Sequence, residues 1–349
     1  MSRLEYLNLY GSGGTVHTLK SRIVRFLRVV YPEEIEIING KVISRINPAT
    51  VETFADRYFS ENRDYKRDIE KFFVSSKTDP PLSRKNSLST IRIMLEQNDH
   101  ELGYLYWKRL LNKITGNRPI TQDKIPTNPQ LKQLLMCMPI PGRALYSTLA
   151  TSGMRIGEAL SLKDGDMDLK SNPVRISIPA KITKTKEARI TFITEEAKSF
   201  VEEWLKIRKD NSRLFSFSDS VAQTYWFVAC EQCKMTQRDS STNRLIYHPH
   251  SLRKYFRTVG GKINRDATEV LMGHKGNQND PNYRRLEEDD LIKFYKQFEP
   301  TITLFSDAEE VKKQVKESLE EYELRFKNLE QLVGELLGTI NKMQGKQTA

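Results

Sequence analysis

The stretch of sequence that decides the fold reads Thr151-Ser152-Gly153-Met154-Arg155-Ile156-Gly157-Glu158-Ala159-Leu160. Gly153 predicts a break between two helices, because glycine readily adopts the backbone angles that end a helix. Arg155 then stands at the start of the second helix, with Glu158 about one turn further on. At that spacing the Glu158 carboxylate can orient the Arg155 guanidinium. On its own this pattern is more typical of a helix cap or an ordinary ion pair than of a catalytic site.

Further polar residues follow at regular places in the same part of the chain. His250-Ser251-Leu252-Arg253 has its histidine and arginine three residues apart, which places both on one face of a helix. Leu271-Met272-Gly273-His274 comes next, and Tyr283 follows nine residues after His274. Each of these residues taken alone is more often structural than chemical, so only their joint pattern indicates a function.

The order S-G-x-R-x-x-E, H-x-L-R, L-x-G-H and a tyrosine nine residues later resembles the tyrosine recombinase (phage-type integrase) family. The resemblance covers about residues 130–285. It implies that the protein is an enzyme, a site-specific DNA recombinase or integrase, of the kind that mobile elements carry. The catalytic residues it implies are Arg155, Lys184, His250, Arg253, His274 and Tyr283.

The lysine of this set depends on a predicted hairpin. Val174–Ile178 and Arg189–Ile193 alternate between apolar and polar residues, as strands with one buried face do. The family carries a lysine on the tip between two such strands, and Lys184 fits that place best. Lys181 and Lys186 remain rivals, because the tip is long and rich in lysine.

The resemblance implies a strand exchange through a covalent 3′-phosphotyrosyl ester, formed by Tyr283. Two guanidiniums, from Arg155 and Arg253, would bind the non-bridging oxygens of the phosphate in the transition state. His274 would add a hydrogen bond, and His250 would accept the phenol proton.

Lys184 would give a proton to the departing 5′-oxygen. No metal ion, ATP or nucleotide cofactor is required for these steps. The implied partners are double-stranded DNA with inverted-repeat recombination sites and further copies of the chain, four protomers in the synaptic complex.

The charge distribution agrees with a polyanionic partner. The 349 residues carry a net charge of +11. Residues 1–124 contribute +6, residues 125–300 contribute +7 and residues 301–349 contribute −2. Two basic bodies would suit a clamp around DNA, because phosphate neutralisation supplies much of the affinity for nucleic acid. A solvated, lysine-rich surface is the ordinary alternative.

We predict a mainly α-helical fold with a small β-sheet, built as a two-domain DNA clamp. Residues 1–124 would be the helical core-binding domain, 125–300 the catalytic domain, and 301–349 a C-terminal helical tail. In the first domain, apolar spacing predicts a helix from Thr15 to Val30 and a hairpin around Asn39-Gly40. Helices are expected from 50 to 113, interrupted at Asp79-Pro80-Pro81.

Several other classes of protein fit poorly. Three cysteines are too few for a disulfide-stapled secreted scaffold. No apolar run reaches the roughly 18–20 residues of a membrane span, and the first residues lack the apolar stretch of a signal peptide. We therefore expect no membrane association and a cytoplasmic protein, associated with the nucleoid when bound to DNA.

Cys230 and Cys233, followed by His248 and His250, superficially resemble a zinc site. The two histidines lie only two residues apart, which is shorter than the spacing in zinc fingers. The apolar residues before the cysteines favour a buried helix instead.

Three alternatives to a recombinase stay open. A type IB topoisomerase uses a similar set of residues, although the H-x-L-R and L-x-G-H boxes favour a recombinase. A transposase with the same catalytic core differs only in its target. A non-catalytic DNA-binding regulator on the same fold is disfavoured by the presence of all six candidate residues.

The tail provides a prediction of its own. Its apolar residues alternate in steps of three and four, the heptad pattern of a coiled coil, through Leu319, Tyr322, Phe326, Leu329, Val333, Leu336, Ile340 and Met343. Deleting residues 306–349 should lower self-association and recombination more than single-site DNA binding or cleavage. Sedimentation of both forms measures this. An unchanged association state would instead favour a helix folded back on its own domain.

Overall fold

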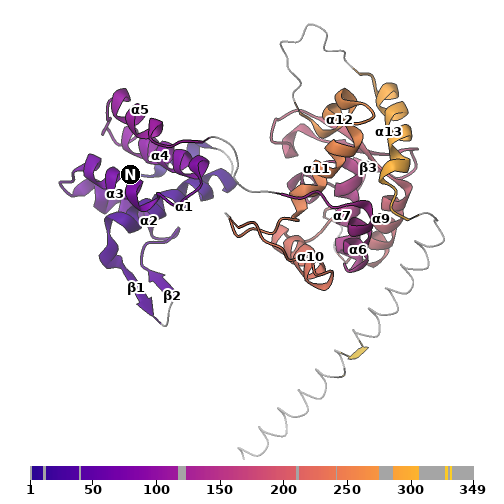
Figure 1. The fold of residues 1–349 in the computed structure, drawn as a ribbon, viewed down its shortest axis with the longest axis horizontal. Helices are drawn as coiled ribbons and strands as arrows, with labels where there is room; N and C mark the ends of the chain where they lie inside the picture. The colour runs from indigo at the N-terminus through magenta and orange to yellow at the C-terminus, as the bar shows by residue number, and fades with distance from the viewer. Residues whose placement is uncertain are drawn as a thin grey trace, which may run out of the picture. The chain divides into compact units, whose positions relative to one another are not determined.

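The protein folds into two compact units. The computed structural model describes residues 2–10, 13–38, 41–116, 123–209, 212–240, 242–274 and 286–305, with 327, 328 and 331. Unit 1 is Met1–Ile120 and unit 2 is Thr121–Ala349 (Figure 1). Each unit has a hydrophobic core of its own. Among the described helices, none is both long enough and apolar enough to cross a membrane.

Unit 1 is mainly helical, with one small β-hairpin. Its elements in chain order are the 3-10 helix η1 (Glu5–Tyr10), α1 (Gly13–Val30), the 3-10 helix η2 (Pro32–Glu34), β1 (Ile35–Ile38), β2 (Lys41–Ser44), α2 (Val51–Ser60), α3 (Tyr65–Ser75), α4 (Pro81–Glu96) and α5 (Tyr104–Asn112).

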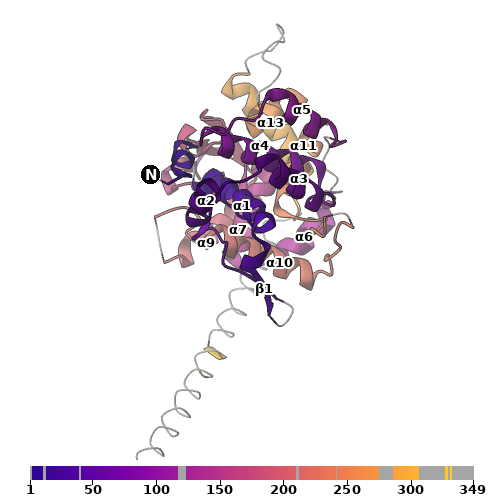
Figure 2. The ribbon, with the colours of Figure 1, turned by 90° about the vertical axis from the view of Figure 1, so that its left-hand side faces the viewer.

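Helix α1 organises the core of unit 1, because its apolar side chains recur at helical spacing on one face. It contacts α2, α3 and α4, which lie next to it in both views (Figures 1 and 2). The Phe26 ring is fully buried. Its centroid lies 5.5 Å from that of Tyr58 on α2 and 5.8 Å from that of Phe72 on α3, both in edge-to-face geometry. The predicted helix up to Val30 is confirmed and begins two residues earlier, at Gly13.

The other local predictions for unit 1 are also confirmed. β1 pairs antiparallel with β2, with Ile35 opposite Ser44 and Ile38 opposite Lys41. The predicted turn residues of this hairpin, 39 and 40, lie outside the described residues. Helices α3 and α4 are separated at the proline pair, because a proline ring restricts the residue before it to extended angles.

Unit 2 is also mainly helical and contains a three-stranded sheet. Its elements in chain order are α6 (Asn128–Met136), α7 (Ile140–Ser152), α8 (Ile156–Ala159), η3 (Asp164–Asp166), β3 (Met167–Asp168), β4 (Val174–Ile178), η4 (Ala180–Ile182), β5 (Arg189–Ile193), α9 (Glu195–Ile207), α10 (Asp219–Gln232), α11 (Pro249–Gly260), α12 (Arg265–Met272) and α13 (Glu288–Ile302).

Helix α7 is the centre of unit 2, and all 13 of its residues are buried. Even its one charged residue, Arg143, lies inside. Its guanidinium donates to the carbonyl oxygens of Leu135 at 3.0 Å and of Met136 and Met138 at 3.2 Å each. The last carbonyl oxygens of a helix lack hydrogen-bond partners within it, and the buried Arg143 supplies donors for those at the end of α6.

The sheet has the order β3-β4-β5 and is antiparallel throughout. β4 and β5 pair in the register Val174 opposite Ile193 and Ile178 opposite Arg189, so both predicted strands are confirmed. β3 is an addition to the prediction, because a strand of two residues is too short to show alternation. The expected fold class, mainly helical with small antiparallel sheets, is confirmed.

The C-terminal tail falls mostly outside the described residues. Unit 2 can be followed without a break from α13 to Phe305, whose ring packs edge-on against Phe200 of α9 with centroids 5.8 Å apart. Beyond it only residues 327, 328 and 331 are described, in helical conformation. The heptad pattern of the tail therefore stays a prediction.

Candidate active site

Arg155 is placed by the glycine break that the sequence predicts. Helix α7 ends at Gly153, which adopts left-handed backbone angles with φ of +64°. A side chain at this position would overlap the ring of Phe256 on α11. The chain therefore turns sharply, and Arg155 becomes the residue that precedes α8.

A buried carboxylate holds this arginine. Glu158 is 2% exposed and accepts hydrogen bonds from both the backbone N–H and the Nη1 of Arg155, each at 2.9 Å. It also accepts from the Nη1 of Arg189 at 3.2 Å and from its Nη2 at 2.6 Å. Burial opposes ionisation of Glu158, but the hydrogen bonds and charges of the two arginines outweigh it and lower its pKa. Glu158 is thus an anion that fixes two guanidiniums.

Arg189 is a site residue that the sequence reasoning missed. It is the first residue of β5, and its Nε donates to the carbonyl oxygen of Leu271 at 3.1 Å. One signal could have found it: Arg189 shares the strand alternation of Thr191 and Ile193, which are fully buried. An arginine on the buried face of a strand requires a carboxylate or carbonyl partner.

Arg253 lies on α11 and is only 4% exposed. Its Nη1 donates to the carbonyl oxygen of Gly153, and its Nη2 to that of Met272 at 2.7 Å. Burial, followed by the positive charge of Arg155, lowers its pKa to about 10, so Arg253 is still charged at neutral pH. This guanidinium ties the end of α7 to the end of α12.

His250 is exposed in the first turn of α11. Partial desolvation, and then the positive charges of His248, Arg253 and Lys254, lower its pKa from the ordinary value of 6.5. His250 is consequently neutral at pH 7, with one ring nitrogen able to accept a proton. The carboxylate of Asp123 holds two of these neighbours, with the His248 Nε2 at 3.1 Å and the Lys254 ammonium in direct contact.

His274 follows the end of α12. Gly273 ends this helix in the left-handed conformation, with φ of +67°, and turns the chain back over it. The His274 backbone N–H donates to the carbonyl oxygen of Glu269 at 3.0 Å, and its Nδ1 contacts the carboxylate of the same residue. The histidine is therefore held by both its backbone and its ring.

The lysines of the hairpin tip are all exposed. Thr183 is 2% exposed, and its hydroxyl accepts from the Glu187 N–H at 3.1 Å, which closes the turn that carries Lys184. This arrangement does not distinguish Lys184 from Lys181 and Lys186. Tyr283 lies outside the described residues, which stop at 274 and resume at 286.

These contacts bring the candidate residues onto one scaffold. Glu158 joins Arg155 to Arg189, which binds the end of α12, and Arg253 joins that end to Gly153. Arg155 and Arg253 lie close enough for their charges to interact. Two guanidiniums and a neutral histidine at one place form a site for an anion with a proton acceptor beside it.

The cysteines take no part in this site. Cys230 is fully buried on α10, as the apolar residues before it predict. The Cys233 Sγ lies 3.1 Å from the Cys137 Sγ at the end of α6, not beside His248. Within the described residues, no three histidine, cysteine or acidic side chains converge to hold a metal ion.

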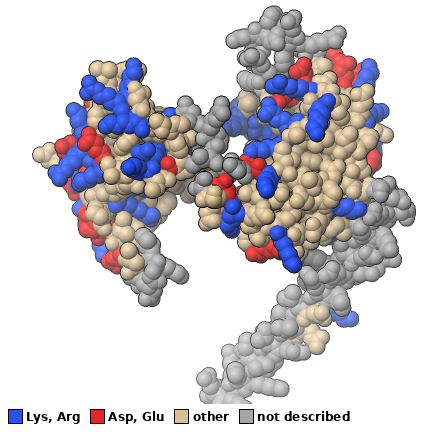
Figure 3. Space-filling view, viewed as in Figure 1, with Lys and Arg blue, Asp and Glu red and all other residues tan. Residues whose placement is uncertain are grey.

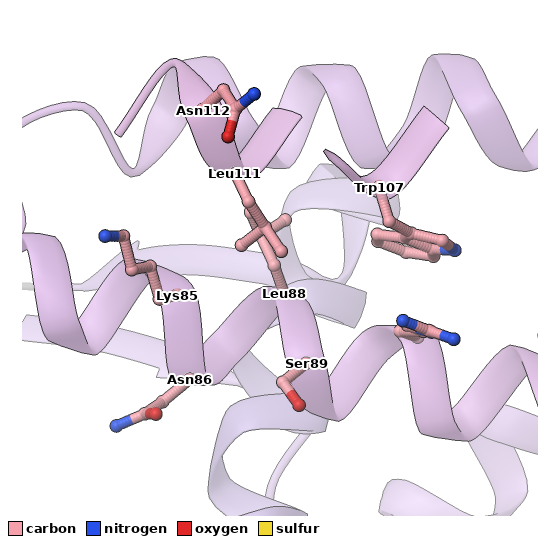
Figure 4. A pocket seen from close by; sticks show the side chains of 8 residues that line it. Lys85, Asn86, Leu88, Ser89, Trp107, Leu111 and Asn112 are labelled. Atoms are coloured by element: carbon pink, nitrogen blue, oxygen red, sulfur yellow. The ribbon is translucent and has the colours of Figure 1, made fainter. Parts of the chain in front are cut away.

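A separate hollow lies on unit 1 between α4 and α5, with a volume of about 430 Å³ (Figure 4). Its lining is mixed: Leu88, Trp107 and Leu111 form the apolar part, and the polar part consists of Lys85, Asn86, Ser89, Arg92 and Asn112. The sequence reasoning did not single out these residues.

Comparison with known proteins finds a family and several relatives that are similar to part of the second unit. Residues 125–289 match the phage integrase family. Tyrosine recombinase XerA of Saccharolobus solfataricus is 30% identical over 166 residues, which are 47% of this chain and 52% of that protein. Tyrosine recombinase XerC of Haemophilus ducreyi is 29% identical over 159 residues, or 44% and 50% of the two chains. The matched part thus spans about half the length of these relatives.

Among solved structures, the crystal structure of XerA recombinase has 20% sequence identity and a TM-score of 0.37, and the match covers 80% of this chain and 98% of that one. A lambda integrase dimer bound to a COC′ core site has 12% identity and a TM-score of 0.49, with 82% and 79% covered.

The sequence motifs predicted a resemblance to this family, and the match confirms it for the part of the chain that carries them. Residues 125–289, which contain Arg155 and Arg253 and the carboxylate of Glu158, are a phage integrase family match with tyrosine recombinases among their relatives.

Gly273→Ala tests whether the turn before His274 depends on glycine. A Cβ here would lie 2.7 Å from the Arg189 Cδ, and φ is +67°. We expect the free energy of unfolding to fall by about 1–3 kcal/mol, and DNA cleavage to fall as Arg189 is displaced. Urea denaturation and a cleavage assay measure the two effects. Gly157→Ala is the matched control, because nothing lies within 4 Å of a Cβ there. Equal behaviour of the two variants would contradict this account of the turn.

Proposed function

We propose that this protein is a site-specific DNA recombinase or integrase, which cleaves and rejoins DNA strands through a covalent 3′-phosphotyrosyl intermediate. The observation that carries the proposal is the pairing of Arg155 and Arg253 on one buried scaffold, within a domain that matches the phage integrase family. Two fixed guanidiniums suit a phosphodiester whose transition state gains negative charge.

The two arginines differ in how firmly their side chains are held and in how exposed they are to solvent. Arg253 is buried and donates to two backbone carbonyls, so its position is set by the ends of α7 and α12. Arg155 is 29% exposed at its side chain and reaches solvent, where a DNA phosphate can approach. Burial, and then the positive charge of Arg155, lowers the pKa of Arg253, and a phosphate between the two arginines would offset their repulsion.

In the proposed cleavage step, the Tyr283 hydroxyl oxygen forms a bond to phosphorus as the bond from phosphorus to the 5′-oxygen breaks. The phenol proton passes to His250, which is neutral at pH 7 because its pKa is lowered. The leaving 5′-oxygen receives a proton from Lys184. Rejoining reverses these transfers with another 5′-hydroxyl. The charges of Arg155 and Arg253 and the hydrogen bond of His274 stabilise the pentavalent phosphorus, so the proposed chemistry needs no metal ion or nucleotide.

Unit 1 is proposed as the core-binding domain, which holds the DNA beside the catalytic domain. Its basic residues support this role. On the face drawn in Figure 3, Lys and Arg side chains lie on the surfaces of both units, with acidic ones interspersed. The lining of the α4–α5 hollow includes the cationic side chains of Lys85 and Arg92 and the amide side chains of Asn86 and Asn112, groups that contact phosphates and bases in protein–DNA interfaces.

The proposed partners are duplex DNA with inverted-repeat sites and three further copies of the chain in a synaptic tetramer. The C-terminal tail would join protomers within that complex. Acting on DNA in this way places the protein in the cytoplasm, at the nucleoid. The number of copies follows from the chemistry of strand exchange between two duplexes, because each duplex must be cut at two positions.

Tyr283→Phe should abolish the covalent protein–DNA adduct, because phenylalanine has no oxygen with which to attack phosphorus. Binding to the same DNA should change little. The measurement is adduct formation on a nicked suicide substrate, separated on a denaturing gel, beside a binding assay. Tyr247→Phe serves as the matched control and should form the adduct. An adduct formed by the Tyr283 variant would assign the nucleophile to another tyrosine.

Lys184→Ala should slow cleavage by about 10²–10⁴-fold, the range typical of a lost general acid. A DNA with a 5′-bridging phosphorothiolate should restore most of the rate, because a thiolate leaves without a proton. Cleavage rates of both substrates give the comparison. Lys181→Ala and Lys186→Ala are matched controls on the same tip. Rescue confined to one of these two would move the general acid to that lysine.

A further inference from the structure

Glu269 has no role in the chemistry described so far, yet it lies directly beside a proposed catalytic histidine. One of its carboxylate oxygens, Oε2, contacts the His274 Nδ1. The other, Oε1, accepts from the Arg257 Nε of α11 at 2.6 Å. The carboxylate thus joins His274 to a second helix, and each of its oxygens has its own partner.

The backbone forces this contact. Helix α12 ends at Met272, and Gly273 returns the chain, so that the Gly273 N–H bonds to Val270 at 2.9 Å and the His274 N–H to Glu269 at 3.0 Å. These paired bonds are typical of a helix that ends at a left-handed glycine. They place His274 back over Glu269, although five residues separate the two in sequence. The meeting of the two side chains is therefore built into the helix end.

The carboxylate is charged where it meets the ring. Burial alone would raise the pKa of Glu269, but the hydrogen bonds and charges of His274 and Arg257 outweigh it and lower the pKa. An anion at this place accepts the Nδ1–H of His274, which selects one orientation of the ring. Nε2 is then the nitrogen left for another partner, and it donates to a phosphate oxygen when the ring carries both protons.

We propose that Glu269 is the positioning residue of His274: it holds Nδ1 and so presents Nε2 to the scissile phosphate, while Arg257 holds Glu269. This inference rests on the proposed function, because it assigns His274 a hydrogen bond to the phosphate. It adds a residue outside the motifs through which the family was recognised. In many enzymes and metal sites, a carboxylate orients a histidine in the same way.

The decisive experiment is a double-mutant cycle on single-turnover cleavage of nicked suicide DNA. Glu269→Ala should slow cleavage by about 10- to 100-fold, as loss of a carboxylate that orients a histidine commonly does. Glu269→Gln should be slowed less, because its amide oxygen can still accept from Nδ1. In a His274→Ala background, either change at 269 should alter the rate less than about 2-fold, since the histidine it acts on is gone. Glu288→Gln, a surface carboxylate paired with Arg175, is the matched control.

The outcomes separate this inference from the proposed function. A wild-type rate for His274→Ala would overturn the role given to that histidine. A slow His274→Ala with a fast Glu269→Ala would overturn the positioning role alone. Equal slowing by Glu269→Ala with and without His274 would do the same, because it would mark Glu269 as merely structural.

A second readout needs no DNA and no activity. The chain contains only five histidines, so the ring nitrogens can be followed by ¹⁵N NMR after histidine labelling. Glu269→Gln should change the Nδ1 shift of His274, because the acceptor of its hydrogen bond is altered, and leave the shifts of His17 and His100, which belong to unit 1, unchanged. Unaltered shifts for His274 would overturn the proposed hydrogen bond even in a variant that folds and cleaves normally.

Discussion

The proposed active site depends on one buried carboxylate. Glu158 is nearly inaccessible to water, and an unpaired charge there would cost several kcal/mol in desolvation. It is tolerated because Arg155 and Arg189 both donate to it. The same pairing fixes the arginines, so the requirement to neutralise Glu158 determines where a DNA phosphate would find its donors. Buried ion pairs can often be replaced by apolar residues without loss of stability. The role of Glu158 in holding the arginines is therefore a functional reason for its presence.

Helix ends supply the rest of the framework. Helices α7 and α12 both stop at glycines with positive φ, and both leave carbonyl oxygens that need donors. Arg253 donates to the carbonyl oxygens of Gly153 and Met272, and Arg189 donates to that of Leu271. Because arginine offers several donors in a fixed plane, one side chain can join elements that are far apart in sequence. The helix ends are thus tied to the guanidiniums proposed to bind phosphate.

Electrostatics within the cluster favour an incoming anion. Arg155 and Arg253 repel each other, and partial burial together with positive neighbours lowers the pKa of His250. Glu158 and Glu269 offset part of this charge but are fully engaged with their own partners. A phosphate would therefore gain from guanidiniums that are already oriented and held in place. Such preorganisation costs no rearrangement at the moment of reaction.

The sequence by itself determined the elements and most candidate residues of this protein. Apolar spacing located α1, and alternation of apolar and polar residues located β4 and β5. The order and spacing of short motifs selected Arg155, His250, Arg253 and His274. All of these signals can be read along the chain without knowledge of its folding. Only the tertiary structure decided the partners: Arg189 for Glu158, Arg257 for Glu269, and Cys137 for Cys233. Such pairs join separate elements, and the packing that removes water from a charged group also selects which distant group must neutralise it. These partners cannot be read from any periodic pattern in the sequence.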